Sequence, residues 1–401
     1  MNTQLKTDAD RILYKVVEGS PHIPGVVAMA TNRQGNIYEG AAGVRAEGTN
    51  EPMTTDTVVC IFSCTKAVTG LTAMQLVEEG KIKLSDPVKE FVPAIAEIPV
   101  LEGFERDGTP RTRRAKTDIT LDQLLTHTAG FGYDFLSHEM LRYNKAKGIP
   151  GLLFTNTKKA LKSVLLFEPG ERWNYGINID WVGLVVEAIR GKCLGEVMKE
   201  RVFDPLEMND TGFAITPAMR PRLAKLHQRW RDGEITVLDR EFPQEADLQP
   251  GGHGLYSTLA DYMKFIRMIL NDGAGPKDRI VKPETVARMA TNGLPSHLRV
   301  ERIPSSDITT CVNDAEFFPG VLKTWSYTFM INEETAPTGR TPGSLAWCGV
   351  ANIYFWIDRT MGLGGMWATQ VFPFGEEVSY LNYLDFETSI YRNMSQSSNS
   401  G

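Results

Sequence analysis

The sequence predicts an α/β protein in which an antiparallel sheet, built from both ends of the chain and flanked by N- and C-terminal helices, carries an inserted, mainly helical lobe. Extended, β-branched segments lie at 24–44 and again at 325–372, whereas 84–213 carries helical periodicity and loops rich in Pro and Gly. An isolated hairpin is only marginally stable, so the early strands must share one sheet with the late strands. The length of 401 residues suits two lobes.

The N-terminal segments predict a helix, a hairpin and a second helix. Residues 8–17 have apolar side chains at helical spacing. Small and β-branched residues at 24–30 and an extended pattern at 37–44, joined by turn residues, predict the β-hairpin. From 65 to 79 the apolar period becomes helical, and Gly80 is a typical helix stop.

The middle of the chain is predicted to be mostly helical, and strands return near its end. Helices are expected at 121–125, 157–166, 178–190 and 258–270, and extended segments at 325–332, 344–358 and 362–372. A final helix at 377–391 precedes a Ser/Asn/Gly tail, 395–401, which we expect to be disordered. The chain therefore divides into an α/β lobe of residues 1–64 and 214–394 and a helical lobe of residues 65–213.

Composition and charge exclude several classes of protein. The net charge of -6 is spread along the chain without a basic block, which argues against nucleic acid and anionic membranes as partners. No stretch reaches the roughly 18 consecutive apolar residues of a membrane span, and residues 1–15 lack the apolar run of a signal peptide. The cysteines are odd in number and form no C-x-x-C pair, so we expect a cytoplasmic protein without disulfides.

The sharpest catalytic candidate is the S-x-x-K run Ser63-Cys64-Thr65-Lys66 at the start of the predicted 65–79 helix. Residues three apart share a helical face, so Lys66 would stand beside the Ser63 hydroxyl and could accept its proton. Backbone N–H groups at a helix start also suit an oxyanion. The alternative is that Ser63 is an ordinary helix cap and Lys66 is solvated.

Two further segments supply candidates. Tyr175 lies in a turn just before the predicted helix at 178–190, and a lysine ammonium beside it would lower the pKa of its phenol enough for it to act as a base. Gly349 lies inside a late strand after Trp347, where glycine often marks the close approach of a ligand, and the N–H of Val350 could donate to an oxyanion. The alternatives are an aromatic helix anchor and a packing contact.

Together these residues carry a family resemblance. The order Ser63 to Lys66, Tyr175 and a late glycine strand resembles the serine β-lactamase and penicillin-binding protein superfamily. Within it the chain is most similar to the class C-related family VIII carboxylesterases and to the fungal lovastatin-type acyltransferases. Supporting stretches are 99–104, 124–130, 175–181 and 251–258. The resemblance implies a β-lactamase/transpeptidase-like fold.

By that resemblance Ser63 would be the acylated nucleophile, with Lys66 and Tyr175 as the pair that removes its proton. The backbone N–H groups of Ser63 and Val350 would form the oxyanion hole. The lysine of the penicillin-recognising strand is replaced by Trp347 here, and the third residue of the family's Y-x-N motif is Ile177. The loss of that lysine weakens the case for a β-lactam substrate.

We therefore expect a small-molecule ester or thioester with an apolar acyl group, and an acyl transferase would also bind an alcohol acceptor. Residues expected to contact the substrate are Trp347, Gly349, Tyr133, Phe131 and Trp325. His127 and His253 are expected to be structural hydrogen-bonders, because the chain has no G-x-S-x-G elbow. No cofactor is expected, and no spacing of His, Cys and carboxylates suggests a metal site.

The leading hypothesis is a serine carboxylesterase or acyltransferase that works through an acyl-enzyme, and the sequence does not separate these two. An amidase or β-lactamase of the same fold is the second hypothesis. A non-catalytic binding protein that keeps the fold is the third, although the presence of Ser63, Lys66 and Tyr175 argues against it. The sequence carries no signal for an oligomeric state.

Overall fold

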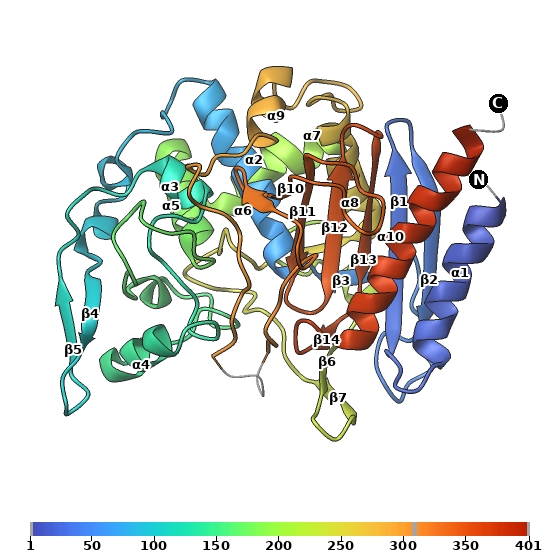
Figure 1. The fold of residues 1–401 in the computed structure, drawn as a ribbon, viewed down its shortest axis with the longest axis horizontal. Helices are drawn as coiled ribbons and strands as arrows, with labels where there is room; N and C mark the ends of the chain where they lie inside the picture. The colour runs from blue at the N-terminus through green and yellow to red at the C-terminus, as the bar shows by residue number, and fades with distance from the viewer. Residues whose placement is uncertain (1–2, 307–310, 399–401) are drawn as a thin grey trace.

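The centre of one lobe is a seven-stranded antiparallel sheet with the order β2-β1-β13-β12-β11-β10-β9 (Figure 1). The computed structural model describes residues 3–306 and 311–398. The early hairpin pairs with a late strand, with Val27 opposite Ala368, so the predicted sheet from both chain ends is confirmed. Its strands are β1 (Gly25–Asn32), β2 (Asn36–Gly43), β9 (Lys323–Trp325), β10 (Met330–Asn332), β11 (Ser344–Gly349), β12 (Ile353–Asp358) and β13 (Leu363–Ala368).

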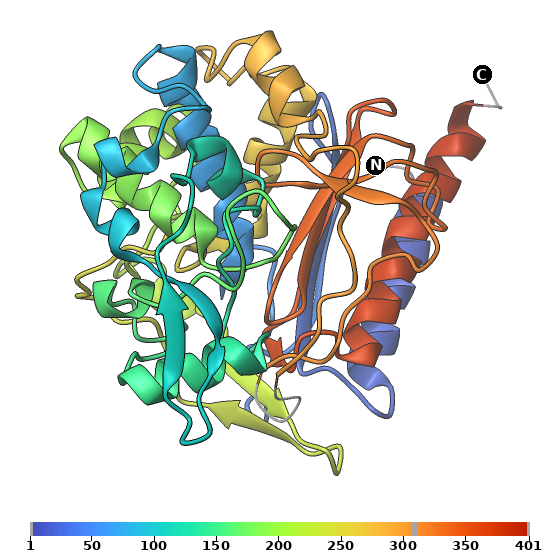
Figure 2. The same cartoon turned by 60° about the vertical axis from the view of Figure 1, so that its left-hand side comes forward.

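Helices cover both faces of this sheet. On one face the first helix, α1 (Thr3–Glu18), packs against the last, α10 (Glu377–Ser398), as Figures 1 and 2 show. On the other face lies α8 (Leu259–Leu270). Successive residues of a strand point to opposite faces. Accordingly, Trp356 of β12 packs on Phe386 of α10, whereas Phe355 packs on Tyr262 of α8.

The last helix is longer than the sequence predicted. It runs to Ser398, so the disorder expected from residue 395 is corrected for 395–398, and 399–401 lie outside the described residues. The helix continues because Ile390 and Tyr391 are buried against the sheet side, and the Ser395 hydroxyl donates to the Tyr391 carbonyl at 2.9 Å. Burial of these turns outweighs the weak helix propensity of serine and asparagine.

The helical lobe is built around α2 (Thr65–Glu78), which packs on α5 (Asn178–Arg190). Around this pair lie α3 (Leu121–Leu125), α4 (His138–Lys147), α6 (Leu194–Met198) and α7 (Asp204–Leu206). Further along the chain, α9 (Pro283–Met289) packs on α2. Short 3-10 turns are η1 (Phe62–Cys64), η2 (Val88–Glu90), η3 (Pro93–Glu97), η4 (Lys158–Leu161) and η6 (Arg220–Arg222), and a π-helical turn is η5 (Lys199–Phe203).

The lobe also contains a hairpin that the sequence did not reveal, β4 (Val100–Phe104) with β5 (Pro110–Arg113). This hairpin explains why the helix predicted at 157–166 is only the 3-10 turn η4. The Leu165 N–H donates to the Pro99 carbonyl at 2.9 Å, and the Leu101 N–H donates to the Leu165 carbonyl at 2.8 Å. The backbone of Leu165 is therefore bonded to the start of the hairpin, and a helix cannot continue to the end of this stretch.

Two further small strand groups complete the fold. A short pair, β3 (Val58–Cys60) with β8 (Tyr256–Thr258), leads into η1 and α2, and a separate three-stranded sheet contains β6 (Leu226–Arg229), β7 (Ile235–Leu238) and β14 (Val371–Phe372).

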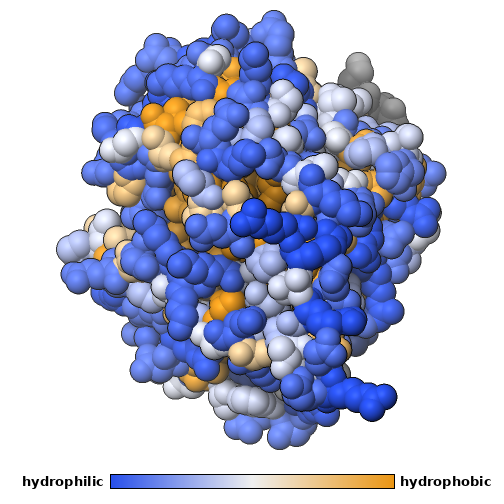
Figure 3. All heavy atoms as spheres, turned by 90° about the vertical axis from the view of Figure 1, so that its left-hand side faces the viewer, coloured by the Kyte–Doolittle hydropathy of each residue, from blue (hydrophilic) through white to orange (hydrophobic). Residues whose placement is uncertain are grey.

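The face on the side of β4, β5 and α4 is mainly hydrophilic, with hydrophobic residues showing between the polar ones (Figure 3). Across 3–306 and 311–398, none of the helices combines the length and apolar character that crossing a bilayer requires.

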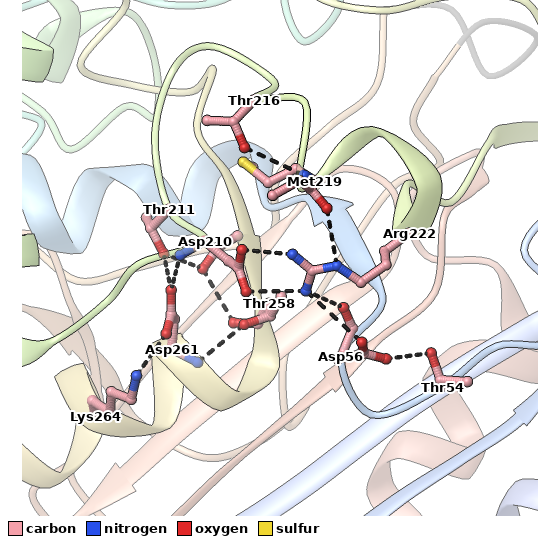
Figure 4. Close-up of polar contacts among 12 residues, drawn as sticks. Thr54, Asp56, Asp210, Thr211, Thr216, Met219, Arg222, Thr258, Asp261 and Lys264 are labelled. Atoms are coloured by element: carbon pink, nitrogen blue, oxygen red, sulfur yellow. Dashed lines mark hydrogen bonds and ion pairs between the residues drawn. The ribbon is translucent and has the colours of Figure 1, made fainter.

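A polar network holds the segment that returns from the helical lobe (Figure 4). The buried carboxylate of Asp261 on α8 accepts from the Asp210 N–H at 2.7 Å and from the Thr211 hydroxyl at 3.0 Å. Both carboxylate oxygens of Asp210 accept from Arg222, whose guanidinium also reaches the Asp56 carbonyl at 3.0 Å. The network therefore ties the returning chain to the segment before β3. The lobe boundaries at 64 and 214 stay a prediction.

Candidate active site

Ser63 lies in a strained turn between β3 and α2. Phe62, the residue before it, has a φ of +44°, which costs on the order of 1 to 3 kcal/mol for a non-glycine residue. Packing holds the turn, because the Phe62 ring is fully buried and contacts Phe154, Phe242 and Phe372 with centroid distances of 5.3 to 6.1 Å. The turn brings the half-buried Ser63 to the wall of a cavity.

Lys66 is fully buried one helical turn further on. Its Nζ lies 3.1 Å from Ser63 Oγ and 3.0 Å from the Tyr133 hydroxyl, and it donates to the Gly252 carbonyl at 2.7 Å. These contacts match the three protons of an ammonium group. The spacing prediction that Lys66 stands beside Ser63 therefore holds in the structure, and the alternative of a solvated lysine does not.

Burial decides the electrostatics of this lysine. It lowers the pKa of Lys66 to about 8, although the Asp180 carboxylate acts in the opposite direction and favours the ammonium. A buried ammonium loses hydration, and the neutral amine gains relative to it. The lowered pKa makes the amine form of Lys66 more accessible near neutral pH, and this form can accept a proton from Ser63.

Tyr175 precedes α5 and lies close to both residues. Its hydroxyl accepts from the Trp347 Nε1–H at 3.0 Å and interacts with the Ser63 hydroxyl. Lys66 Nζ lies 4.7 Å from the centre of the Tyr175 ring. The sequence-based expectation of a lowered pKa is corrected, because burial raises the pKa of the Tyr175 phenol well above its ordinary value. Tyr175 is therefore a neutral phenol that can pass protons on.

The end of β11 lies against the turn that carries Ser63. A Cβ atom on Gly349 would lie 2.6 Å from the Ile61 carbonyl oxygen, which is closer than a side chain can approach. Glycine is required at this position because the two backbones are in contact. Val350, the next residue, lines the same cavity as Ser63. Ser63 and Val350, the predicted oxyanion donors, therefore both line this cavity.

The cavity is narrow and mainly apolar, with a volume of about 50 Å³, enough for a few waters or a small acyl group. It is lined by Phe62, Ser63, Tyr133, Phe135, Leu136, Leu153, Tyr175, His253, Ile303, Val312, Trp347, Cys348, Val350 and Phe374. Tyr133 and Trp347 were expected to contact the substrate, and both lie here. Phe131 and Trp325 were also expected, and the structure does not bring them to this cavity.

Those two aromatic rings lie behind the site. Phe131 stacks on Trp181 with a centroid distance of 5.9 Å. Trp325 packs edge-on against Trp347 at 4.5 Å and against His127 at 5.1 Å. Both are fully buried, so they support the residues that line the cavity.

The two histidines make structural hydrogen bonds. The His127 ring pairs with the Asn178 amide at 2.9 Å, and His253 pairs with Asn156 Oδ1 at 3.1 Å. Burial lowers the pKa of both, that of His253 to about 3, so both rings are neutral near pH 7. Within 3–306 and 311–398, no cluster of His, Cys, Asp and Glu could hold a metal ion.

Two parts of the site were missed at the level of sequence. Asp180 is fully buried, and its Oδ1 accepts from the Gly252 N–H at 2.8 Å. Tyr133 was expected only as a substrate contact, yet it hydrogen-bonds Lys66. Asp180 did carry a signal, because it is an acidic residue between the apolar side chains of Ile179 and Trp181 on a helix predicted to be buried.

The sheet, the helices on its faces and the S-x-x-K serine against the edge of β11 define a β-lactamase-like serine protein. The chain belongs to the Beta-lactamase family, whose model matches residues 13–390. This confirms the superfamily resemblance seen in the sequence.

Three known proteins show which members of the family this chain is similar to. The chain is 31% identical to monacolin J acid methylbutanoyltransferase of Aspergillus terreus, over 94% of each chain. It is 30% identical to lovastatin esterase of Penicillium rubens, covering 93% of this chain and 95% of that one. The structure of simvastatin synthase from Aspergillus terreus matches with a TM-score of 0.84 at 28% identity, covering 96% and 97% of the two chains. These are acyl-transfer and ester-cleaving enzymes, which agrees with the expected class.

Proposed function

We propose that this protein is a serine carboxylesterase or acyltransferase that acts on small apolar esters through an acyl-enzyme on Ser63. One observation carries the proposal. The Ser63 hydroxyl lies 3.1 Å from a fully buried lysine amine, at the wall of an apolar cavity. Serine becomes a nucleophile only when a neighbouring base takes its proton, and Lys66 is placed to do so.

The reaction divides into two acyl transfers. Ser63 Oγ attacks the ester carbonyl as its proton passes to the Lys66 amine, and the N–H groups of Ser63 and Val350 stabilise the oxyanion. The C–O bond then breaks, and the leaving alcohol takes a proton through the Tyr175 phenol, which Lys66 replenishes. In the second half, water or an alcohol loses its proton to the same pair and attacks the acyl carbonyl. The bond between that carbon and Ser63 Oγ then breaks, and Ser63 Oγ takes the proton from Lys66, which restores the free enzyme.

The cavity supports an uncharged acyl group. Among its described lining residues none is a cation near pH 7, because the His253 ring has a pKa of about 3 and Trp347 stands where penicillin-recognising relatives are expected to have lysine. A carboxylate in this space would lose its hydration and find no positively charged partner among the described lining residues. The β-lactamase alternative is therefore the weaker one.

A second hollow favours acyl transfer as well as hydrolysis. It has a volume of about 480 Å³ and shares Tyr133, Leu136, Tyr175 and Ile303 with the small cavity. An alcohol bound there would reach the acyl-enzyme on the side of Tyr175. The names of the relatives include both a transferase and an esterase, and we propose that this chain can use either acceptor. A cytoplasmic location stays a prediction.

Wild type and Ser63→Ala are compared for hydrolysis of a short-chain p-nitrophenyl ester, with the intact mass of each protein recorded after brief mixing. We expect a transient acyl adduct on the wild type and a loss of turnover by several orders of magnitude in the variant. Adding a primary alcohol should divert part of the acyl group into a new ester. Unchanged turnover in Ser63→Ala would overturn the proposed nucleophile.

A further inference from the structure

Asp180 is a buried carboxylate for which the proposed chemistry has no role so far. It lies in the first turn of α5 and is fully buried, as is Lys66. Its Oδ1 accepts from the Gly252 N–H at 2.8 Å. Its Oδ2 is buried and has no hydrogen-bond partner among the described residues. A carboxylate in this position is costly unless a nearby positive charge compensates it.

Gly252 connects the carboxylate to the catalytic lysine. Its N–H donates to Asp180, and its carbonyl accepts from Lys66 Nζ at 2.7 Å. A Cβ atom at this position would lie 2.6 Å from Asp180 Oδ2, so only glycine lets the carboxylate lie against the loop. One residue therefore links both charged groups and fixes their separation.

The other titratable groups around Lys66 are neutral near pH 7. Burial raises the pKa values of Tyr133, Tyr175, Cys64 and Cys348. Burial lowers those of His127 and His253, which also lie within the field of Lys66. Burial likewise raises the pKa of Asp180, to about 6, and Lys66 opposes this rise. Among the described groups, the anion that acts on Lys66 at neutral pH is therefore Asp180.

We propose that Asp180 is a positioning residue for acyl transfer: through Gly252 it fixes the Lys66 amine beside Ser63, and its negative charge sets the pH range in which that amine accepts the serine proton. The inference rests on the proposed function. The Asp180 charge stabilises the ammonium, so removing it makes the amine available at lower pH. Removing the Asp180 charge also makes the Lys66 amine a weaker base, which lowers the reaction rate at high pH.

The test is the pH dependence of Ser63 labelling by a fluorophosphonate. Asp180→Asn keeps an oxygen for the Gly252 N–H and removes the charge. On the acid side of the profile, the labelling rate rises with pH as Lys66 loses its proton, and we call this rise the acid limb. We expect its midpoint to move down by about one pH unit or more in Asp180→Asn, since opposite charges within several ångströms shift a pKa by that amount. The plateau rate should fall as well. Asp134→Asn is the matched control, because Asp134 is a half-buried carboxylate whose pKa burial also raises, and it is not among the charges that shift the pKa of Lys66. The acid side of its pH profile should stay in place.

An acid limb that does not move in a folded Asp180→Asn variant would overturn the inference. If circular dichroism shows that this variant is unfolded, Asp180→Ser is read in the same way, because it removes the charge and leaves space for a water on the Gly252 N–H. Absence of labelling in the wild type is a different result, since it would contradict the Ser63 nucleophile and hence the proposed function itself.

Discussion

Trp347 combines two contacts that bear on specificity. Its indole N–H donates to the Tyr175 hydroxyl at 3.0 Å, and its ring lines the cavity beside Ser63. By the family resemblance a lysine would stand at this strand position in penicillin-recognising enzymes. The indole keeps a hydrogen-bond donor beside Tyr175 and removes the positive charge. A neutral donor orients the phenol without attracting a carboxylate substrate.

Substitution of Trp347 should change the preference of the protein between charged and neutral ester substrates. Trp347→Lys is expected to raise kcat/KM for an ester whose acyl group bears a carboxylate, relative to the methyl ester of the same compound. Trp347→Phe is the matched control, since it removes the indole without adding charge. It should lower turnover of both substrates about fivefold, the value of one hydrogen bond of roughly 1 kcal/mol. An unchanged substrate ratio in Trp347→Lys would remove Trp347 from the specificity site.

At the level of single residues, the sequence predicted contacts that are local and missed those between distant segments. Ser63 and Lys66 could be paired because helical spacing alone places them together. The hydrogen bond from Lys66 to Tyr133 joins residues 67 positions apart, and the periodicity of the sequence gives no indication of it. The same limit applies to aromatic residues. Trp347 and Phe131 have the same apolar character in sequence, and only the packed fold decides that one faces the cavity.

The approach of β11 to η1 is the contact between elements on which the site depends. Val350 follows directly after the strand, and the turn supplies Ser63. Gly349 lets the two backbones touch, because a Cβ atom there would lie 2.6 Å from the Ile61 carbonyl oxygen. The backbone at Ile61 cannot move aside as easily as the end of a flexible side chain would. Any side chain at Gly349 must therefore push the strand away from the turn and separate the proposed oxyanion donors.

Gly349→Ala is expected to lower kcat by about 10² to 10³, the loss that follows removal of one oxyanion donor. KM should change little, because the cavity walls stay in place. Gly35→Ala is the control, since a Cβ atom on Gly35 meets no atom within 4 Å. It should leave both parameters unchanged. Wild-type kcat in Gly349→Ala would show that Val350 does not contribute to the oxyanion site.

Helices and strands with a strong sequence periodicity were predicted well. Segments whose conformation depends on contacts with distant parts of the chain were not. The strands at 24–44 and the α8 helix carry their own patterns, and both are present. The stretch 157–166 has helical spacing but pairs with Pro99 and Leu101 through its backbone. Conversely, 395–398 has a composition typical of loops and is helical because the preceding turns are anchored on the sheet. Tertiary contacts overrode local propensity in both cases.

The site is assembled from both lobes, so it depends on how they are joined. Lys66 and Tyr175 come from the helical lobe, Trp347 comes from β11 of the sheet, and Val350 comes from the turn after that strand. The network around Asp261 holds the returning segment in place through Asp210, Thr211 and Arg222. Its loss should loosen the junction before it unfolds either lobe.

Asp261→Ala leaves the half-buried Asp210 N–H without its acceptor and removes one of two partners of the Thr211 hydroxyl, which keeps Ser257 Oγ at 2.8 Å. The free energy of unfolding should fall by about 1 to 3 kcal/mol, measured by urea denaturation. Lys264→Ala is the control, since Lys264 binds the same carboxylate at 2.8 Å from a half-buried position near the surface. A surface ion pair contributes at most about 1 kcal/mol. Equal losses in the two variants would show that the buried bonds of Asp261 carry no special weight.

The pairing of β1 with β13 also has a consequence during synthesis. Val27 leaves the ribosome well before its partner Ala368, because the two are 341 positions apart in the sequence. At about 5 to 20 residues per second the first hairpin waits on the order of tens of seconds for the strand that covers its edge. An unpaired, apolar strand edge invites association with other chains over that time. We therefore expect slower translation and higher temperature to reduce the yield of native protein, and chaperones that cover nascent strands to restore it.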